Sequence, residues 1–512
     1  MDRATRQRIQ DATEAARDLL ERDYGEQLDA TFDVRPDGTI APEPGTHLGS
    51  EPRLRIVRSK LLAALDHHQS AGLSAAEAVA GFRREAAFTT LNRFVALKML
   101  EGRGLVQECV SRGEQSSGFK EFVGLAPGLG TLPDHGYRLY LECLFDEIGR
   151  DVRILFDRRD PAGLLWPGRS TLNDLLDRLN APDLAGVWGE DETIGWVYQY
   201  FNGGEERRSM RSESQAPRNA RELAVRNQFF TPRYVVRFLT DNTLGRLWIE
   251  MHGDRSRLAD RCEFLVRGPD EASRSRPKKD PREIRILDPA CGSGHFLLYA
   301  FDLLLAIYEE AWHDESSALR SDFPDLGALR IEAPRLAIER NLFGVDIDPR
   351  CAQIAALALW LRAQRAWKDA GIPAADRPPV RKTNVVVAEP IPNDPAMVAE
   401  FGAGLESPLL RSLFERFVAE SRLAGELGTL LRIEDSIAGE LRAARERFVQ
   451  DRRTSGAIDL SGVEDERFLE EAEGRILDQL RHYADAATGG AGVRRRLFAD
   501  DAAQGIAFVD VL

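Results

Sequence analysis

The stretch from Ile284 to Leu298 constrains this chain most, and it reads I-R-I-L-D-P-A-C-G-S-G-H-F-L-L. Its apolar start, with Ile284, Ile286 and Leu287, predicts a buried strand that leads into Asp288. A turn with two glycines and an apolar, helix-like segment follow. A strand, a glycine turn and a helix present backbone N–H groups and a helix N-terminus to a ligand. A carboxylate at the end of such a strand lies where doubly wound sheets bind ligands. The stretch therefore predicts a Rossmann-like α/β fold.

The glycines of this turn, Gly292 and Gly294, narrow the kind of ligand. A Cβ at either position would block close approach and penalise a positive φ. A dinucleotide fingerprint needs G-x-G-x-x-G, and Leu297 stands where the third glycine would be. This residue counts against a dinucleotide, and a glycine-rich turn alone does not identify another ligand.

Four segments together resemble one family. The string D-P-A-C-G-S-G-H-F resembles motif I, D-P-A-x-G-S-G-x-F/L, of the S-adenosylmethionine (AdoMet)-dependent adenine-N6 DNA methyltransferases. The segment N-L-F-G-V-D-I-D, from Asn341, resembles motif II, and F-T-P-R-Y-V-V, from Phe230, resembles motif X. The segment I-G-W-V-Y-Q-Y-F-N, Ile194 to Asn202, resembles G-W-x-Y-Q-x-Y/F-N of large single-chain enzymes in BREX and DISARM phage defence and of type IIG restriction–modification enzymes.

The resemblance implies a site for AdoMet and no metal. A carboxylate that ends the second strand suits both ribose hydroxyls, and motif II gives this role to Asp346. Motif X lies beside motif I in the family and contacts the methionine carboxylate. Ile347 then stacks on adenine, and Glu389, after a predicted strand at Asn384–Pro390, accepts from the adenine amino group. The implied cofactor-binding residues are Phe230, Thr231, Asp288, Ala290, Gly292, Gly294, Phe296, Asp346, Ile347 and Glu389.

Cap residues predict helix boundaries near these motifs. Thr231 is expected to be the N-cap of the motif X helix, with Pro232 at the first helical position and Gly245 at the end. Asp348, followed by Pro349, is expected to cap the helix after motif II.

No catalytic residue is assigned. Adenine-N6 transfer in the family uses [D/N/S]-P-P-[Y/F/W] to hold the amine and stack on the flipped base. Neither Arg377-Pro378-Pro379-Val380 nor Asn393-Asp394-Pro395-Ala396 fits this pattern. We expect the chain to be the N-terminal portion of a larger enzyme, whose C-terminal half or partner subunit supplies catalysis and recognition of double-stranded DNA.

The expected organisation has five segments. Residues 1–203 are an all-α N-terminal domain, and 204–283 are a connector with the motif X helix at 228–245. Residues 284–400 are the AdoMet-binding methyltransferase half, with a sheet incomplete at its C-terminal end. Residues 401–485 are a helical insertion, and 486–512 are the truncated start of the catalytic half. Within the first segment, the helix from Phe88 is expected to carry Asn92 and Arg93 on its polar side. The aromatic segment at Ile194 is interpreted as a core helix rather than a DNA-facing surface.

Composition excludes several classes. Asp plus Glu number 83 against 69 Lys plus Arg, a net charge of −14, so a wholly basic nucleic-acid footprint is excluded and a local basic groove is not. No apolar run approaches the roughly 20 residues that span a bilayer, and the N-terminus has no signal-peptide core. Five scattered cysteines without C-x-x-C predict reduced thiols in a cytoplasmic protein and no zinc cluster.

Two alternatives stay open. The first is a non-catalytic scaffold or regulatory subunit with a relic methyltransferase fold. The acidic charge and a long helical stretch after Phe401 favour it, whereas intact Asp288, Gly292, Gly294 and Asp346 disfavour it. The second is a small-molecule or RNA methyltransferase, which accounts for motif I but poorly for the aromatic segment and the T-P helix.

Overall fold

The computed structural model describes residues 2–41, 52–70, 73–190, 193–202, 208, 210–212, 214, 231–253, 256–266, 276–315, 317–387, 411 and 415. The chain divides into one unit of Met1–Arg58 and Val79–Ala388 and a second of Ser59–Ala78 and Glu389–Leu512. Phe230, Glu389, the expected segment 486–512, and the expected helical insertion apart from Arg411 and Glu415 lie outside the described residues.

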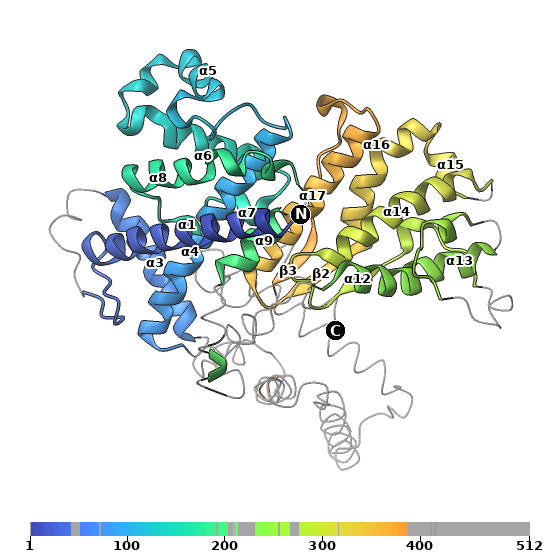
Figure 1. Ribbon diagram of the computed structural model, residues 1–512, viewed down its shortest axis with the longest axis horizontal. Helices are drawn as coiled ribbons and strands as arrows, with labels where there is room; N and C mark the ends of the chain where they lie inside the picture. The colour runs from blue at the N-terminus through green and yellow to red at the C-terminus, as the bar shows by residue number, and fades with distance from the viewer. Residues whose placement is uncertain are drawn as a thin grey trace, which may run out of the picture. The chain divides into compact units, whose positions relative to one another are not determined.

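The described residues up to Asn202 are arranged as helices joined by turns (Figure 1). The helices are α1 (Arg3–Ala30), α3 (Pro52–Ser70), α4 (Ala75–Gly102), α5 (Ser117–Leu125), α6 (Tyr137–Ile148), α7 (Arg153–Phe156), α8 (Arg169–Leu179) and α9 (Thr193–Phe201). The long helix α1 packs against α8 and α9, and α9 in turn contacts α17 (Pro349–Asp369) of the α/β part. This last contact joins the helical part of the first unit to its sheet.

The second half of α4 differs from the expected amphipathic helix. Asn92 and Arg93 were expected on a polar side, but their exposed fractions are 0% and 5%. Arg93 is buried because its guanidinium donates to the carbonyl oxygens of Leu155 and Asp157, each at 2.8 Å. The helix is therefore enclosed on all sides there, and no solvent-facing side remains for these two residues.

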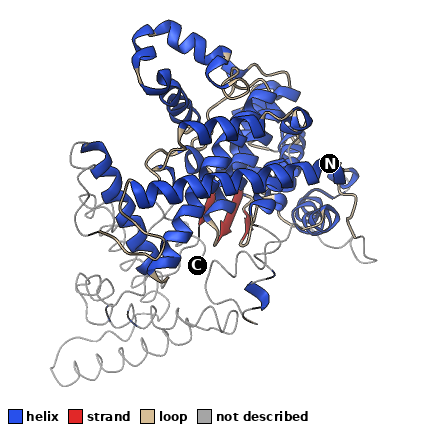
Figure 2. Cartoon of the chain, turned by 60° about the vertical axis from the view of Figure 1, so that its left-hand side comes forward, coloured by secondary structure: helices blue, strands red, loops and turns tan. Residues whose placement is uncertain are grey.

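The sheet consists of three parallel strands in the order β1 (Ile286–Asp288), β2 (Leu342–Asp346) and β3 (Asn384–Val387). Figure 2 shows the three strands side by side among the helices. This order is one half of a doubly wound sheet. Helices α14 (His295–His313), α15 (Leu319–Asp322) and α16 (Leu326–Leu336) connect β1 to β2, and α17 connects β2 to β3.

One face of the sheet packs against α14 and α17, which contact the strands and each other. Leu342 and Val385 on this face are fully buried. The predicted buried strand is only partly buried: Ile284 is buried but precedes β1, and Leu287 within β1 is 46% exposed. Side chains alternate across a strand, so Leu287 points away from the helices that cover Ile286.

The motif X segment forms α12 (Arg233–Thr240), a π turn (Asp241–Gly245) and α13 (Arg246–His252). Two predicted boundaries are wrong. The N-cap is Pro232 rather than Thr231, and the carbonyl oxygen of Pro232 accepts the N–H of Val235 at 2.9 Å. Gly245 does not end the helix, and a Cβ there would lie 2.7 Å from the Cys262 sulfur. This glycine therefore permits close packing inside a continuing helix.

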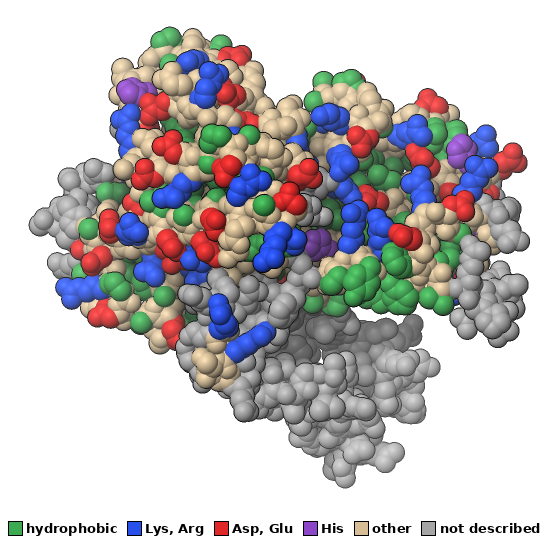
Figure 3. All heavy atoms as spheres, in the orientation of Figure 1, with side chains coloured by type: hydrophobic (Ala, Val, Ile, Leu, Met, Phe, Trp, Pro, Cys, Tyr) green, Lys and Arg blue, Asp and Glu red, His purple; other side chains and the backbone are tan. Residues whose placement is uncertain are grey.

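Helix α12 lies against α14, the helix that follows motif I, as the resemblance implied. The Tyr299 hydroxyl of α14 donates to Asp241 at 2.7 Å. The outer side of α12 is apolar, and Tyr234, Phe238 and Leu239 are 63%, 42% and 45% exposed. Figure 3 shows green side chains gathered where Figure 1 places α12.

The five cysteines form no disulfide with one another. Among the described residues, no helix combines the length and the apolar character needed to cross a membrane.

Asn341, immediately before β2, links the sheet to α14. Its buried amide donates to the carbonyl oxygens of Pro281 and Ile284 at 2.7 and 2.8 Å. Its own carbonyl oxygen accepts the Tyr308 hydroxyl at 2.9 Å. This side chain therefore fixes the entry to β1 relative to β2.

We predict that Asn341→Ala lowers the free energy of unfolding by about 2–3 kcal/mol, because it removes three buried hydrogen bonds. Tyr308→Phe removes only one of these hydrogen bonds and is expected to cost about 1 kcal/mol. Urea unfolding of both variants measures the difference. Equal losses would contradict the role assigned to Asn341.

Candidate cofactor-binding site

The two predicted strand-end aspartates lie on the same face of the sheet. Asp288 ends β1 and pairs in register with Gly344, which precedes Asp346 by two residues on β2. Because residues two apart on a strand share a face, and partners in adjacent strands do as well, the carboxylates of Asp288 and Asp346 share a face. Both stand at the carboxyl edge of the sheet, where doubly wound sheets bind ligands.

Hydrogen bonds join the turn after β1 to the carboxyl end of β2. The N–H of Cys291 donates to the Val345 carbonyl oxygen at 2.9 Å. The Asp346 carboxylate accepts the N–H of Gly292 at 2.8 Å through one oxygen and the N–H of Asp348 at 2.9 Å through the other. Asp346 thus connects the glycine turn of motif I to the loop of motif II.

Glycine suits the two positions of the turn for different structural reasons. Gly294, with φ +84°, is the N-cap of α14, and a Cβ on it would lie 3.1 Å from the Cβ of Ala355. Gly292 has φ +53°, and a Cβ on it would meet no described atom within 4 Å. Gly294 therefore allows α14 to approach α17, whereas Gly292 faces no neighbour within the described residues.

The site carries negative charge that the folded chain only partly compensates. Asp288 accepts the N–H of Ala290 at 3.2 Å through Oδ1, while its buried Oδ2 has no hydrogen-bond partner within the described part of the chain. Burial, together with the charge of Asp346, raises the pKa of Asp288. Burial and the nearby charge of Asp348 raise the pKa of Asp346. Such a site favours a ligand that brings hydrogen-bond donors or positive charge.

The remaining predicted residues are placed as follows. Ala290 is exposed and Ile347 is 40% exposed, on the loops after β1 and β2. Phe296 is partly buried in the first turn of α14, and Thr231 is partly buried ahead of α12. The prediction that Asp348 caps the next helix is confirmed, since its side chain accepts the N–H of Arg350 at 3.0 Å.

A buried ion pair that the sequence did not predict lies beside the site. Arg350 pairs with Asp348 at 2.7 Å, and both side chains are less than 10% exposed. Tyr198 and Asn202, from the aromatic segment, hydrogen-bond to this pair. Two features of the sequence could have indicated this pair. Arg350 follows the capping Asp348 by two residues, and Tyr198 and Asn202 are polar residues of a largely apolar segment. Neither feature identifies the interaction partner.

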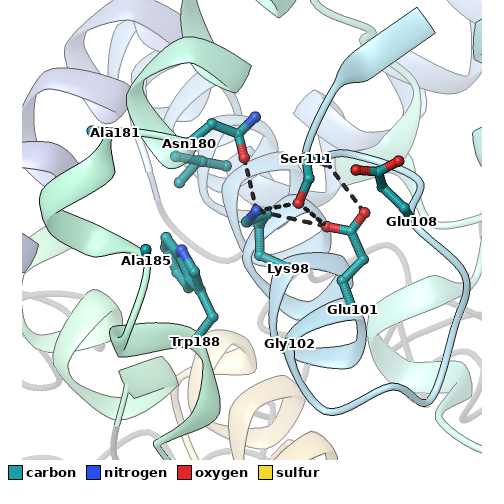
Figure 4. A pocket seen from close by; sticks show the side chains of 10 residues that line it. Lys98, Glu101, Gly102, Glu108, Ser111, Asn180, Ala181, Ala185 and Trp188 are labelled. Carbon is teal, nitrogen blue, oxygen red and sulfur yellow. Dashed lines mark hydrogen bonds and ion pairs between the residues drawn. The ribbon is translucent and has the colours of Figure 1, made fainter. Parts of the chain in front are cut away.

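A separate cavity of about 440 Å³ lies in the helical region before α9 and is lined by parts of α4, the 108–111 loop and residues 179–188 (Figure 4). Lys98 donates to Ser111 at 2.6 Å and to Asn180 at 2.7 Å and lies 3.6 Å from Glu101. Glu101 also accepts the backbone N–H groups of the loop, including that of Val110 at 2.9 Å. These polar groups form hydrogen bonds with one another and hold the loop in place. We therefore assign the polar residues of this cavity a structural role.

Comparisons with known proteins agree with the motifs. Residues 275–389 match the family model of the MmeI DNA-methyltransferase domain. The chain is 31% identical over 217 residues to the adenine-specific methyltransferase BrxX of Escherichia coli O9:H4 (strain HS), covering 40% of this chain and 16% of that protein. It is 29% identical over 279 residues to the adenine-specific methyltransferase PglX of Lacticaseibacillus casei (strain Zhang), covering 52% and 21%.

A third relative is a putative type II restriction enzyme and methyltransferase of Methanocaldococcus jannaschii, 44% identical over 80 residues, which are 15% of this chain and 6% of that protein. The alignments span about a fifth or less of the relatives' lengths. The similarity to adenine-specific methyltransferases predicted from the motifs is confirmed.

We predict that Asp288→Asn raises the melting temperature by a few degrees at neutral pH, because it removes a partly buried charge and its repulsion from Asp346. A raised pKa means that the folded wild type binds more protons than the unfolded chain, so its stability falls as pH rises through that window. The advantage of the variant should therefore shrink as pH falls toward about 3.9. Circular dichroism melts at neutral and acidic pH measure it.

The matched control is Glu283→Gln, which removes an exposed carboxylate shortly before β1. Its melting temperature should follow the wild type at both pH values. A less stable Asp288→Asn variant at neutral pH would show that the Asp288 charge is compensated in the fold.

Proposed function

We propose, on the premise of this relationship to adenine-specific methyltransferases, that the chain forms the AdoMet-binding part of a site-specific DNA adenine-N6 methyltransferase of phage defence or restriction–modification. The observation that carries the proposal is the pair of strand-end carboxylates, Asp288 and Asp346, on one face of the sheet and around one glycine turn. A doubly wound sheet binds nucleoside ligands at this edge.

The chemistry of the residues fits AdoMet. Each oxygen of Asp346 accepts one described N–H group, and a carboxylate oxygen can accept more than one hydrogen bond, which suits the two ribose hydroxyls. The buried Oδ2 of Asp288, which has no partner in the described part of the chain, suits a cationic or donor group of the methionine part. The exposed Ile347 side chain offers an apolar surface for the adenine ring. When bound, AdoMet would supply a methyl group activated by its sulfonium.

The proposed site extends to Ala290, Gly292, Gly294 and Phe296, which belong to the turn and the first residues of α14. We assign Phe230 and Thr231 to the methionine carboxylate and Glu389 to the adenine amino group on the strength of the motifs. Phe230 and Glu389 lie outside the described residues.

We assign the chemistry on the target base to a [D/N/S]-P-P-[Y/F/W] segment that these 512 residues do not hold. The one Pro-Pro pair, at Arg377-Pro378-Pro379-Val380, is a poor substitute. Val380 is fully buried, and the Arg377 guanidinium donates to Gln364 and to the Ile372 carbonyl oxygen. Neither side chain is available to hold or stack on a base.

We propose double-stranded DNA as the substrate of the complete enzyme, because the family model matched is that of a DNA-methyltransferase domain. Acidic and basic side chains intermix over the face drawn in Figure 3, and the chain carries a net charge of −14. The polypeptide with the base-binding segment would then contribute much of the DNA contact.

We predict that Asp346→Ala weakens AdoMet binding roughly 10- to 100-fold, since a hydrogen bond to a charged group contributes about 1.5–3 kcal/mol. Isothermal titration measures the affinity. Glu283→Ala, which removes an exposed carboxylate shortly before β1, is the control and should bind as the wild type does. Equal affinities of Asp346→Ala and wild type would refute the site.

We predict that the chain alone transfers no methyl group to DNA. Addition of a polypeptide that carries the [D/N/S]-P-P-[Y/F/W] segment should restore methyl transfer to adenine. Incorporation of radiolabelled methyl into duplex DNA measures both. Methylation of adenine by the 512-residue chain alone would place the base-binding residues within it and overturn the division of labour.

A further inference from the structure

The ion pair between Asp348 and Arg350 is the most buried charged pair beside the candidate site. The Arg350 guanidinium donates through Nε to one oxygen of Asp348 at 2.8 Å and through Nη2 to the other at 2.7 Å. The side chains are 4% and 9% exposed. A pair removed from water to this degree is stable only when its remaining polar atoms also find partners.

Helix α9 and the residue that follows it supply those partners. The Tyr198 hydroxyl donates to Asp348 Oδ2 at 3.0 Å, and Arg350 Nη1 donates to Asn202 Oδ1 at 2.8 Å. Tyr198 lies in the last turn of α9, and Asn202 directly follows the end of the helix. The C-terminal end of α9 and the residue after it therefore contact both the anion and the cation of the pair.

Aromatic rings around Arg350 hold the arrangement further. The guanidinium carbon lies 5.4 Å from the centre of the Phe88 ring, and Phe88 meets Tyr198 edge to face at 5.8 Å. Stacking on a ring and a bidentate carboxylate together leave a guanidinium little freedom. The position of the β2 loop is thus set by residues far from it in the sequence.

The same loop carries the proposed ribose ligand. The N–H of Asp348 donates to Asp346 Oδ1 at 2.9 Å, and Asp346 Oδ2 accepts the N–H of Gly292. Fixing the Asp348 side chain fixes the peptide that donates to Asp346. The hydrogen bonds therefore run without a break from α9, through Asp348, to the carboxylate of Asp346.

We propose that Tyr198 and Asn202 are positioning residues for AdoMet, which act on the orientation of the Asp346 carboxylate without touching the cofactor. The inference rests on the proposed function, since it takes Asp346 as the ribose ligand. It also gives the aromatic segment a role beyond closing the helical core. Binding to a preorganised carboxylate does not require the entropic cost of ordering that side chain. Loss of the hydrogen-bond network should therefore lower the affinity for AdoMet.

The structure offers a matched pair of variants on the same helix. Tyr198→Phe deletes the hydroxyl that reaches Asp348 and keeps the ring. Tyr200→Phe deletes a hydroxyl from the opposite side of α9, where the Tyr200 ring stacks on Trp196 at 5.6 Å. We expect Tyr198→Phe to weaken AdoMet binding about fivefold to tenfold and Tyr200→Phe to leave it within about twofold. Isothermal titration of the full chain measures both, and Asn202→Ala, expected to resemble Tyr198→Phe, serves if Tyr198→Phe does not fold.

A double-mutant cycle separates positioning from general stability. If Tyr198 acts through Asp346, Tyr198→Phe should change affinity by less than about twofold when Asp346→Ala is already present. The same loss in both backgrounds would show that Tyr198 only supports the core. Absence of AdoMet binding by the wild type would instead overturn the proposed function and this inference with it, whereas wild-type binding with equal Tyr198→Phe and Tyr200→Phe affinities would overturn the inference alone.

Discussion

The carboxylate of Asp346 is the interaction on which the candidate site depends. It accepts one N–H from the glycine turn and one from its own loop, so the loops after β1 and β2 form a single surface. The Asp288 carboxylate stands on the same face, and one of its oxygens has no hydrogen-bond partner among the residues that the structure describes. Within the described residues, the edge of the sheet is therefore anionic and uncovered at Gly292. Such an edge is complementary to a ligand that carries a positive charge and ribose hydroxyls.

A buried ion pair, and not apolar packing alone, holds the loop after β2 in place. Arg350 and Asp348 link α17 to α9, although the family match covers only residues 275–389 and α9 lies outside it. Burial alone would raise the pKa of Asp348, but Arg350 and its hydrogen bonds keep that pKa below its usual value. The pair stays ionised in the interior, and ionised pairs require specific geometry. The helices before Asn202 thus bear directly on the methyltransferase-like part.

The differences from expectation share one cause, which is that a linear pattern does not show what lies across the space between elements. Gly245 was expected to end a helix because glycine often does so, yet it admits the sulfur of Cys262. Arg93 was expected at the surface because arginine is charged, yet two carbonyl oxygens receive it in the interior. Thr231 precedes the motif X helix without being its N-cap.

The sequence by itself determined the local elements of the site. Glycines with positive φ at Gly292 and Gly294, a strand that ends at Asp346 and the cap at Asp348 follow from conformational preferences within a few residues. The tertiary structure alone decided that Asp288 and Asp346 share a face and that Tyr198 and Asn202 reach the ion pair. Strand register and helix docking join residues about 50 to 150 positions apart, and their partners are chosen by burial and hydrogen bonding in three dimensions, which no local pattern encodes.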